Sequence, residues 1–121
     1  MPQRVLIVDD ALFMRKLLRD IFTAAGWEVA GEAEDGQEAL QRYRELKPDL
    51  VTLDIVMPQR SGIEALQDII AADQDAVVIM CSALGQESMV MEAIQNGARD
   101  FIVKPFQAEQ VLEVVKRTLG R

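Results

Sequence analysis

Short apolar runs alternate along this chain with longer segments in which apolar residues recur every three or four positions. The short runs predict buried strands, and the longer segments predict amphipathic helices with one apolar face. The expected strands are Val5–Val8, Glu28–Glu32, Leu50–Leu53, Ala76–Cys81 and Phe101–Val103, of which the second shows the weakest pattern.

Five helical segments follow these runs in turn. The first is expected to begin after Asp10, which is a suitable N-cap, and to end at Gly26. The other expected helices are Gln37–Leu46, a segment that starts at Ser61–Gly62, Gln86–Asn96 and Ala108–Leu119. This alternation predicts a doubly wound α/β fold of five βα units, with a parallel sheet covered by helices on both faces. No linker interrupts the pattern, so we expect residues 1–121 to form one domain.

The composition narrows the class of protein. The formal net charge of −7 argues against a nucleic-acid surface and against docking on acidic membranes. The single cysteine rules out an internal disulfide and suggests a reducing compartment. The N-terminus has no basic segment followed by a long apolar stretch, so we expect no signal peptide, and no apolar run approaches about 20 residues. We therefore expect a cytoplasmic monomer without a membrane segment.

Each of the four strong strands ends in a polar side chain. Asp9 and Asp10 follow the first strand, Asp54 the third, Ser82 the fourth and Lys104 the fifth. The carboxyl ends of parallel strands meet at one edge of the sheet, where ligands bind. Three carboxylates, one hydroxyl and one ammonium are therefore expected to converge there.

This combination of side chains indicates a particular chemistry. Clustered carboxylates repel each other by about 4 kcal/mol per pair at 4 Å and an effective dielectric of about 20, and a divalent cation removes that cost. A site of oxygen ligands without histidine or thiolate points to Mg²⁺. Lys104 and Ser82 can then contact the oxygens of a transferred phosphoryl group. Asp54, which stands alone at its strand end, is the candidate nucleophile.

The residues at these positions resemble those of response-regulator receiver domains, over nearly the whole chain. The resemblance rests on VLIVDD, KPDLVTLDIVMPQRSGIEAL, CSA and GARDFIVKPF at their observed spacings. Among receivers, ALFMRKLL, CSALGQESMVMEAI and DFIVKPF are most similar to stand-alone chemotaxis regulators of the CheY type. The resemblance implies a flavodoxin-like sheet with the strand order 2-1-3-4-5.

The resemblance also implies roles for individual residues. Asp54 is expected to be the phosphoacceptor and, with Asp10 and the main-chain carbonyl of Val56, a direct ligand of Mg²⁺, while Asp9 binds the ion through water. Ser82 and Lys104 are expected to contact the phosphoryl group. The Lys104–Pro105 peptide bond is expected to be cis.

Further expectations concern signalling. Phe101 occupies the aromatic switch position of the family, where tyrosine is common in chemotaxis members. The fourth and fifth helices carry more apolar residues than one inward face needs. We expect the extra residues Val90 and Val114 to form a partner surface with Phe101. Val56 and Leu84 hold the positions that flank the path of the hydrolytic water. Because both are apolar, we expect slow dephosphorylation and a separate phosphatase.

Three functions remain open at this point. The favoured one is a signalling switch that takes a phosphoryl group from a partner histidine kinase and acts on a protein such as a flagellar motor switch component. The absence of histidine fits, because the phosphohistidine must then come from the kinase. An aspartate-nucleophile phosphohydrolase is disfavoured, since Val56 stands where such enzymes usually carry a second acid. A receiver module cut from a longer regulator is the third, although a chain that ends directly after its last helix favours a stand-alone protein.

Overall fold

The computed structural model describes residues 3–57 and 61–120, in which five strands alternate with five helices. The second and fourth predicted helices agree with the structure to within a residue at each end, and the last agrees at both ends. The strands are β1 (Arg4–Val8), β2 (Glu28–Ala33), β3 (Leu50–Asp54), β4 (Val78–Ser82) and β5 (Asp100–Val103). The helices are α1 (Leu12–Ala24), α2 (Gly36–Leu46), α3 (Gly62–Ala72), α4 (Glu87–Gln95) and α5 (Ala108–Leu119).

The strands form one parallel sheet in the order β2-β1-β3-β4-β5, which confirms the predicted fold class and strand order. The chain runs from β1 outward to β2 and then returns past β1 to β3. The order therefore reverses between β1 and β3, and the carboxyl ends of these two strands are where an open parallel sheet holds its ligands. In the register, Val8 is opposite Leu53, so the residues that follow them, Asp9 and Asp54, come side by side.

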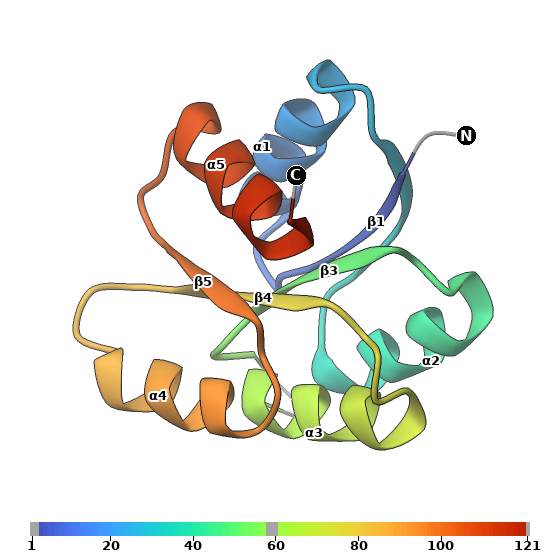
Figure 1. The fold of residues 1–121 in the computed structure, drawn as a ribbon, viewed down its shortest axis with the longest axis vertical. Helices are drawn as coiled ribbons and strands as arrows, with labels where there is room; N and C mark the ends of the chain where they lie inside the picture. The colour runs from blue at the N-terminus through green and yellow to red at the C-terminus, as the bar shows by residue number, and fades with distance from the viewer. Residues whose placement is uncertain (1–2, 58–60, 121) are drawn as a thin grey trace.

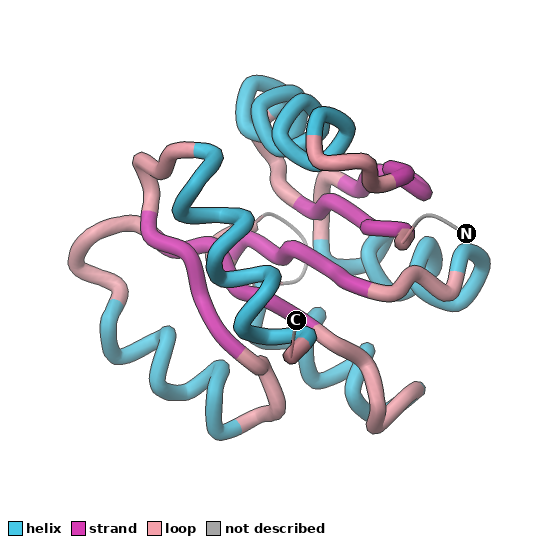
Figure 2. Tube along the Cα trace, turned by 45° about the horizontal axis from the view of Figure 1, so that its top comes forward, coloured by secondary structure: helices cyan, strands magenta, loops and turns pink. Residues whose placement is uncertain are grey.

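Helices cover both faces of the sheet, with α1 and α5 on one side and α2, α3 and α4 on the other (Figures 1 and 2). Alternate strand residues enter two separate cores. On β1, Leu6 and Val8 belong to the core beneath α2–α4, whereas Val5 and Ile7 belong to the core beneath α1 and α5. Burial on both faces explains why β1, β3 and β4 are apolar almost throughout, whereas the edge strand β2 contains two glutamates. None of the helices in the described part of the chain is long and apolar enough to cross a membrane.

The start of α1 differs from the prediction. The N-cap is Ala11 rather than Asp10, and it makes no side-chain capping bond. The physical reason lies one residue earlier, because Oδ1 of Asp9 accepts the main-chain N–H of Ala11 across 2.9 Å. This turn keeps the two aspartates outside the helix, so Asp10 is free of a capping role.

The boundaries of β4 also differ. The apolar run predicts a strand over Ala76–Cys81, but the strand begins at Val78 and includes Ser82. Ala76 instead donates its N–H to the carbonyl of Asp73 in the turn after α3. The chain is therefore still turning when the apolar run begins, and Ser82 becomes the last residue of the sheet rather than the first residue of a loop.

Candidate metal and phosphoryl site

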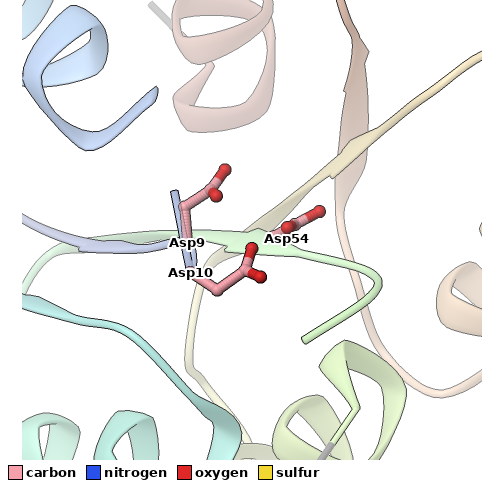
Figure 3. A group of neighbouring side chains, drawn as sticks. All are labelled: Asp9, Asp10 and Asp54. Carbon is pink, nitrogen blue, oxygen red and sulfur yellow. The ribbon is translucent and has the colours of Figure 1, made fainter. Parts of the chain in front are cut away.

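Three carboxylates gather at the carboxyl edge of the sheet, as the strand ends predict (Figure 3). Asp9 and Asp10 follow β1, and Asp54 ends the neighbouring strand β3. One oxygen from each carboxylate lies within 4.8 Å of one from each of the others. Asp9 and Asp54 are buried and Asp10 is exposed, so the cluster opens to solvent on the Asp10 side.

Lys104, which follows β5, partly neutralises this cluster. Its Nζ donates to Oδ2 of Asp9 across 2.9 Å and lies 3.4 Å from Oδ1 of Asp54. Burial opposes the charge of the ammonium, but the two carboxylates outweigh it and raise the pKa of Lys104 above its usual value. Lys104 therefore remains charged and links the two buried aspartates.

Asp54 is the carboxyl group whose protonation this environment alters. Its burial, followed by the negative charge of Asp9, raises the pKa of Asp54 to about 6, although Lys104 acts in the opposite direction. One ammonium shared between two carboxylates thus leaves part of their repulsion uncompensated. A carboxylate held in this way gains from any additional positive charge that reaches it.

The donor set fits Mg²⁺. All three side chains offer carboxylate oxygens, the ligand type that this ion prefers. Two oxygens on one Mg²⁺ lie at most about 4.2 Å apart, twice the usual ligand distance, so the cluster needs only a small contraction to share one ion. One carboxylate of the cluster, that of Asp10, is exposed, so an ion and its waters could reach the site from that side.

Ser82 and Lys104 meet at the neighbouring strand ends. Ser82 is buried at the end of β4, and its main-chain carbonyl accepts the N–H of Lys104 across 2.7 Å. The Lys104–Pro105 peptide bond is cis, as the resemblance implies. The five polar residues expected at the strand ends therefore all lie at the same edge of the sheet.

Phe101 on β5 is 39% exposed and lies between two hollows. One, of about 220 Å³, is lined by Ser82, Val90 and Phe101 among others, and the second, of about 440 Å³, extends past Lys104 to Val114. A ring at this position has free space on the side of Ser82. The sequence placed Phe101 at the surface correctly, but the hollow beside it was not predictable.

One residue of the partner surface expected from the sequence is buried rather than exposed. Val90 is only 6% exposed and packs into the core beneath α4, and Val114 is half-buried against the core beneath α5. The exposed apolar side chains of this region are instead Met91 and Ile94 on α4, with Phe101 and Val103 on β5. On a short helix rich in apolar residues, the periodicity alone did not reveal which of two faces is buried.

The rim of the acidic cluster carries apolar side chains. Val56, two residues after Asp54, and Leu84, two residues after Ser82, are both exposed. Two more, Leu12 and Phe13 in the first turn of α1, are exposed close to the aspartate pair in sequence and were not identified from the sequence. Their exposure could have been predicted from the helical periodicity, because Leu12 and Phe13 lie off the apolar face of α1.

Gly62, the first residue of α3, lies directly against the backbone of Asp54. Its N–H donates to the carbonyl of Ile55 across 2.7 Å. A Cβ at this position would lie 2.0 Å from the carbonyl oxygen of Asp54 and 2.6 Å from the Cα of Ile55. Only glycine permits this approach, so Gly62 helps to fix the position of Asp54.

The sequence matches the family described as the response regulator receiver domain over residues 5–116. It is 58% identical over 117 residues to the chemotaxis protein CheY of Thermotoga maritima, covering 97% of this chain and 98% of that protein. It is 57% identical over 120 residues to CheY of Bacillus subtilis, covering 99% of this chain and all of that protein.

Solved structures of receiver domains have the same fold as this chain. CheY in the CheX–CheY–BeF₃–Mg²⁺ complex of Borrelia burgdorferi superposes with a TM-score of 0.95 at 44% identity, covering 98% of this chain and 90% of that one. The response regulator domain of Thermotoga maritima CheB gives a TM-score of 0.91 at 41% identity, covering 100% and 98% of the two chains.

Proposed function

The chain belongs to the family of response regulator receiver domains, and from this premise we propose that it is a chemotaxis regulator of the CheY type, phosphorylated on Asp54. The observation that carries the proposal is the convergence of Asp9, Asp10, Asp54 and Lys104 at the edge of the sheet. In this proposal residues 1–121 act as one receiver domain in the cytoplasm, with no substrate other than the phosphoryl group that the domain itself carries.

The proposed reaction moves a phosphoryl group from a phosphohistidine of a partner kinase to Asp54. A bond forms between an Oδ atom of Asp54 and the phosphorus, while the P–N bond breaks and its electron pair stays on the imidazole nitrogen of the donor. Since the donor keeps that electron pair, the site needs no base of its own. This is consistent with a chain that lacks histidine.

Mg²⁺ is the proposed cofactor. It would be held by Asp10, Asp54 and the main-chain carbonyl of Val56, with Asp9 contributing through water, and would supply positive charge beside the phosphoryl oxygens. Lys104 already donates to Asp9 at one side of the cluster, so its ammonium is positioned to contact the phosphoryl group from that side.

Switching is proposed to pass from Ser82 to Phe101. When the hydroxyl of Ser82 turns to bond the phosphoryl group, the Phe101 ring would move into the hollow of about 220 Å³ that both residues line. An inward ring would change the exposed surface formed by α4 and β5, where a downstream protein such as a flagellar motor switch component would bind. Because Val56 and Leu84 offer no polar group to the hydrolytic water, a separate phosphatase is expected to reset the signal.

Phosphorylation is tested with acetyl phosphate and Mg²⁺, and then with a chemotaxis histidine kinase. The wild-type protein should gain the mass of one phosphoryl group, and Asp54→Asn should gain none. Asp75→Asn, which changes an exposed aspartate in the turn before β4, is the matched control and should behave as wild type. Phosphorylation of Asp54→Asn at the wild-type level would refute the assignment of the acceptor.

The partner surface is tested at Met91, because Val90 is buried and a charge there would disturb the core. Met91→Glu should abolish binding of the phosphorylated chain to a flagellar motor switch component, yet leave phosphorylation intact. Ala71→Glu, at an exposed position on α3, is the control and should retain binding. If Met91→Glu binds as well as wild type, the surface of α4 and β5 is not the partner surface.

A further inference from the structure

The guanidinium group of Arg15 binds the loop that carries Asp9 and Asp10, which we call the acidic loop. Arg15, in α1, donates from Nη1 to the main-chain carbonyl of Asp9 across 2.6 Å. Its Nε donates to Oε1 of Glu32 on β2 across 3.0 Å. The Arg15 side chain is only 12% exposed, so these contacts are shielded from water. Arg15 thereby joins the acidic loop to its own helix and to the neighbouring strand.

The contact with Arg15 completes the hydrogen bonding of Asp9. The N–H of Asp9 donates to the carbonyl of Ala33, Oδ1 accepts from Ala11, and Oδ2 accepts from Lys104. The remaining acceptor is the carbonyl that Arg15 binds. That carbonyl belongs to the peptide unit linking Asp9 to Asp10, so its orientation determines where the side chain of Asp10 begins.

Asp10 has little else to hold it. Over residues 3–57 and 61–120, its carboxylate takes part in no hydrogen bond or ion pair of the structure, and it is exposed. Its place within 4.8 Å of the carboxylates of Asp9 and Asp54 therefore depends on the backbone that precedes it.

We propose that Arg15 is a positioning residue for the metal site, an inference that rests on the proposed function: by holding the Asp9–Asp10 peptide it keeps the carboxylate of Asp10 within the cluster. Charge alone argues for the opposite effect, because a guanidinium near the site repels a cation. Glu32 offsets this repulsion, since it accepts hydrogen bonds from both Arg15 and Arg19. Burial of Glu32 works against its charge, yet the two arginines prevail and lower its pKa. The structure thus keeps the geometric benefit of Arg15 while neutralising its charge.

Arg19 provides a matched control in the same helix. It lies one turn after Arg15, carries the same charge and donates to Oε2 of the same Glu32. It makes no hydrogen bond to the acidic loop in the described part of the chain, and its side chain is 46% exposed. The two arginines therefore share a charge and a partner, and of the two only Arg15 makes the contact on which the proposal depends.

The experiment is a calorimetric titration of the purified full chain with MgCl₂, without any phosphodonor. Arg15→Met should weaken Mg²⁺ binding by about tenfold, the lower end of the usual cost of losing an outer-shell contact. Arg19→Met should leave the dissociation constant unchanged or slightly lower, because it removes only a positive charge. If Arg15→Met binds Mg²⁺ as tightly as wild type, or more tightly, charge is the whole effect and the proposal is overturned.

Arg15→Lys covers the case in which Arg15→Met does not fold. A lysine keeps the charge but has a single ammonium, which cannot hold the Asp9 carbonyl and Glu32 in the paired geometry of the guanidinium. It should bind Mg²⁺ several-fold more weakly than wild type, and a wild-type affinity would overturn the proposal.

Asp10→Asn, titrated in parallel, separates this inference from the proposed function. If wild type gives no binding heat, or Asp10→Asn binds as tightly as wild type, the metal site is wrong and the inference falls with it. If Asp10→Asn loses affinity and Arg15→Met does not, the metal site stands and only the role of Arg15 is wrong.

Discussion

Lys104 and Asp9, 95 positions apart in the sequence, are joined by a hydrogen bond of 2.9 Å between Nζ and Oδ2. The same ammonium lies 3.4 Å from Asp54. Among the residues that the structure describes, Lys104 is the cation that contacts the carboxylates of the cluster, and it would compete with a metal ion for the same oxygens.

Replacing Lys104 with methionine should make the protein more dependent on Mg²⁺. Breaking a buried ion pair costs about 3–5 kcal/mol, and the partial exposure of Lys104 reduces the expected loss in the metal-free protein to about 2 kcal/mol. Mg²⁺ binding should become tighter, because its competitor is gone. Urea unfolding with EDTA and with MgCl₂ measures both effects, with Lys116→Met on the exposed side of α5 as the control. An unchanged stability in EDTA would contradict this assignment.

Mg²⁺ should stabilise the wild-type fold by about 2.7 kcal/mol at a concentration 100 times its dissociation constant. Without metal, the two neighbouring aspartates should behave differently. Asp10→Asn should stabilise slightly, because it removes a repelling charge that has no partner among residues 3–57 and 61–120. Asp9→Asn should destabilise, because Lys104 and the Ala11 N–H both lose a charged acceptor. Thermal melts with EDTA and with MgCl₂ test this pair, and equal effects of the two substitutions would be inconsistent with the structure.

The raised pKa of Asp54 predicts how the unfolding free energy of the protein in EDTA depends on pH. The folded state holds the Asp54 proton up to about pH 6, whereas an unfolded aspartate releases it near its usual value of about 3.9. The folded state therefore binds more protons between these values. This contribution to the unfolding free energy, about 2–3 kcal/mol, is complete below about pH 4 and is lost as the pH rises through about 6.

The comparison that isolates this contribution is wild type against Asp54→Asn. Urea unfolding at a series of pH values from about 4.5 to 7.5, in EDTA, should show the wild-type stability falling relative to the variant. Saturating Mg²⁺ should abolish the difference in slope, because it favours the charged carboxylate throughout. Parallel curves for the two proteins in EDTA would contradict the raised pKa.

Gly62→Ala should destabilise the protein by about 3 kcal/mol or more, because the new Cβ meets the main chain of Asp54 and Ile55 rather than a movable side chain. Ser61→Ala is the neighbouring control. It removes the side-chain cap of α3 and should cost only about 1 kcal/mol. Urea unfolding ranks the two variants, and a smaller cost for Gly62→Ala would mean that the loop before α3 shifts easily.

The exposed apolar residues Val56 and Leu84 should keep dephosphorylation slow. Val56→Asn combined with Leu84→Glu supplies polar groups that can orient a water molecule and should speed decay by roughly tenfold. The decay of purified phosphoprotein in Mg²⁺, after removal of the phosphodonor, measures the rate. Leu12→Glu, which adds a charge at another exposed position, controls for the change in net charge. An unchanged rate would remove the reason to expect a dedicated phosphatase.

The sequence predicted the parts of this protein that depend on periodicity. Strand–helix alternation determines which residues stand at strand ends, and parallel pairing then brings Asp9, Asp54 and Lys104 together whatever the loops do. The strand order came from the family resemblance, and the register of Val8 with Leu53 is consistent with it.

The errors have local physical causes. The N-cap is Ala11 rather than Asp10 because the side chain of Asp9 accepts the N–H of Ala11 in a turn that keeps both aspartates outside the helix. Val90 was assigned to the wrong face because α4 is short and apolar on two sides. The bridge from Arg15 to Glu32 joins two neighbouring elements through exact side-chain lengths, which no periodic pattern encodes.

The bond between Lys104 and Asp9 also has a consequence for synthesis on the ribosome. Asp9, Asp10 and Asp54 all emerge in the first half of the chain, whereas Lys104 follows the last strand, at the edge of the sheet. A nascent chain that has paired β1 with β3 thus carries all three carboxylates before their ammonium has been made. Translation of β5 and the residues after it therefore completes the sheet and also supplies the ammonium that pairs with Asp9 and Asp54.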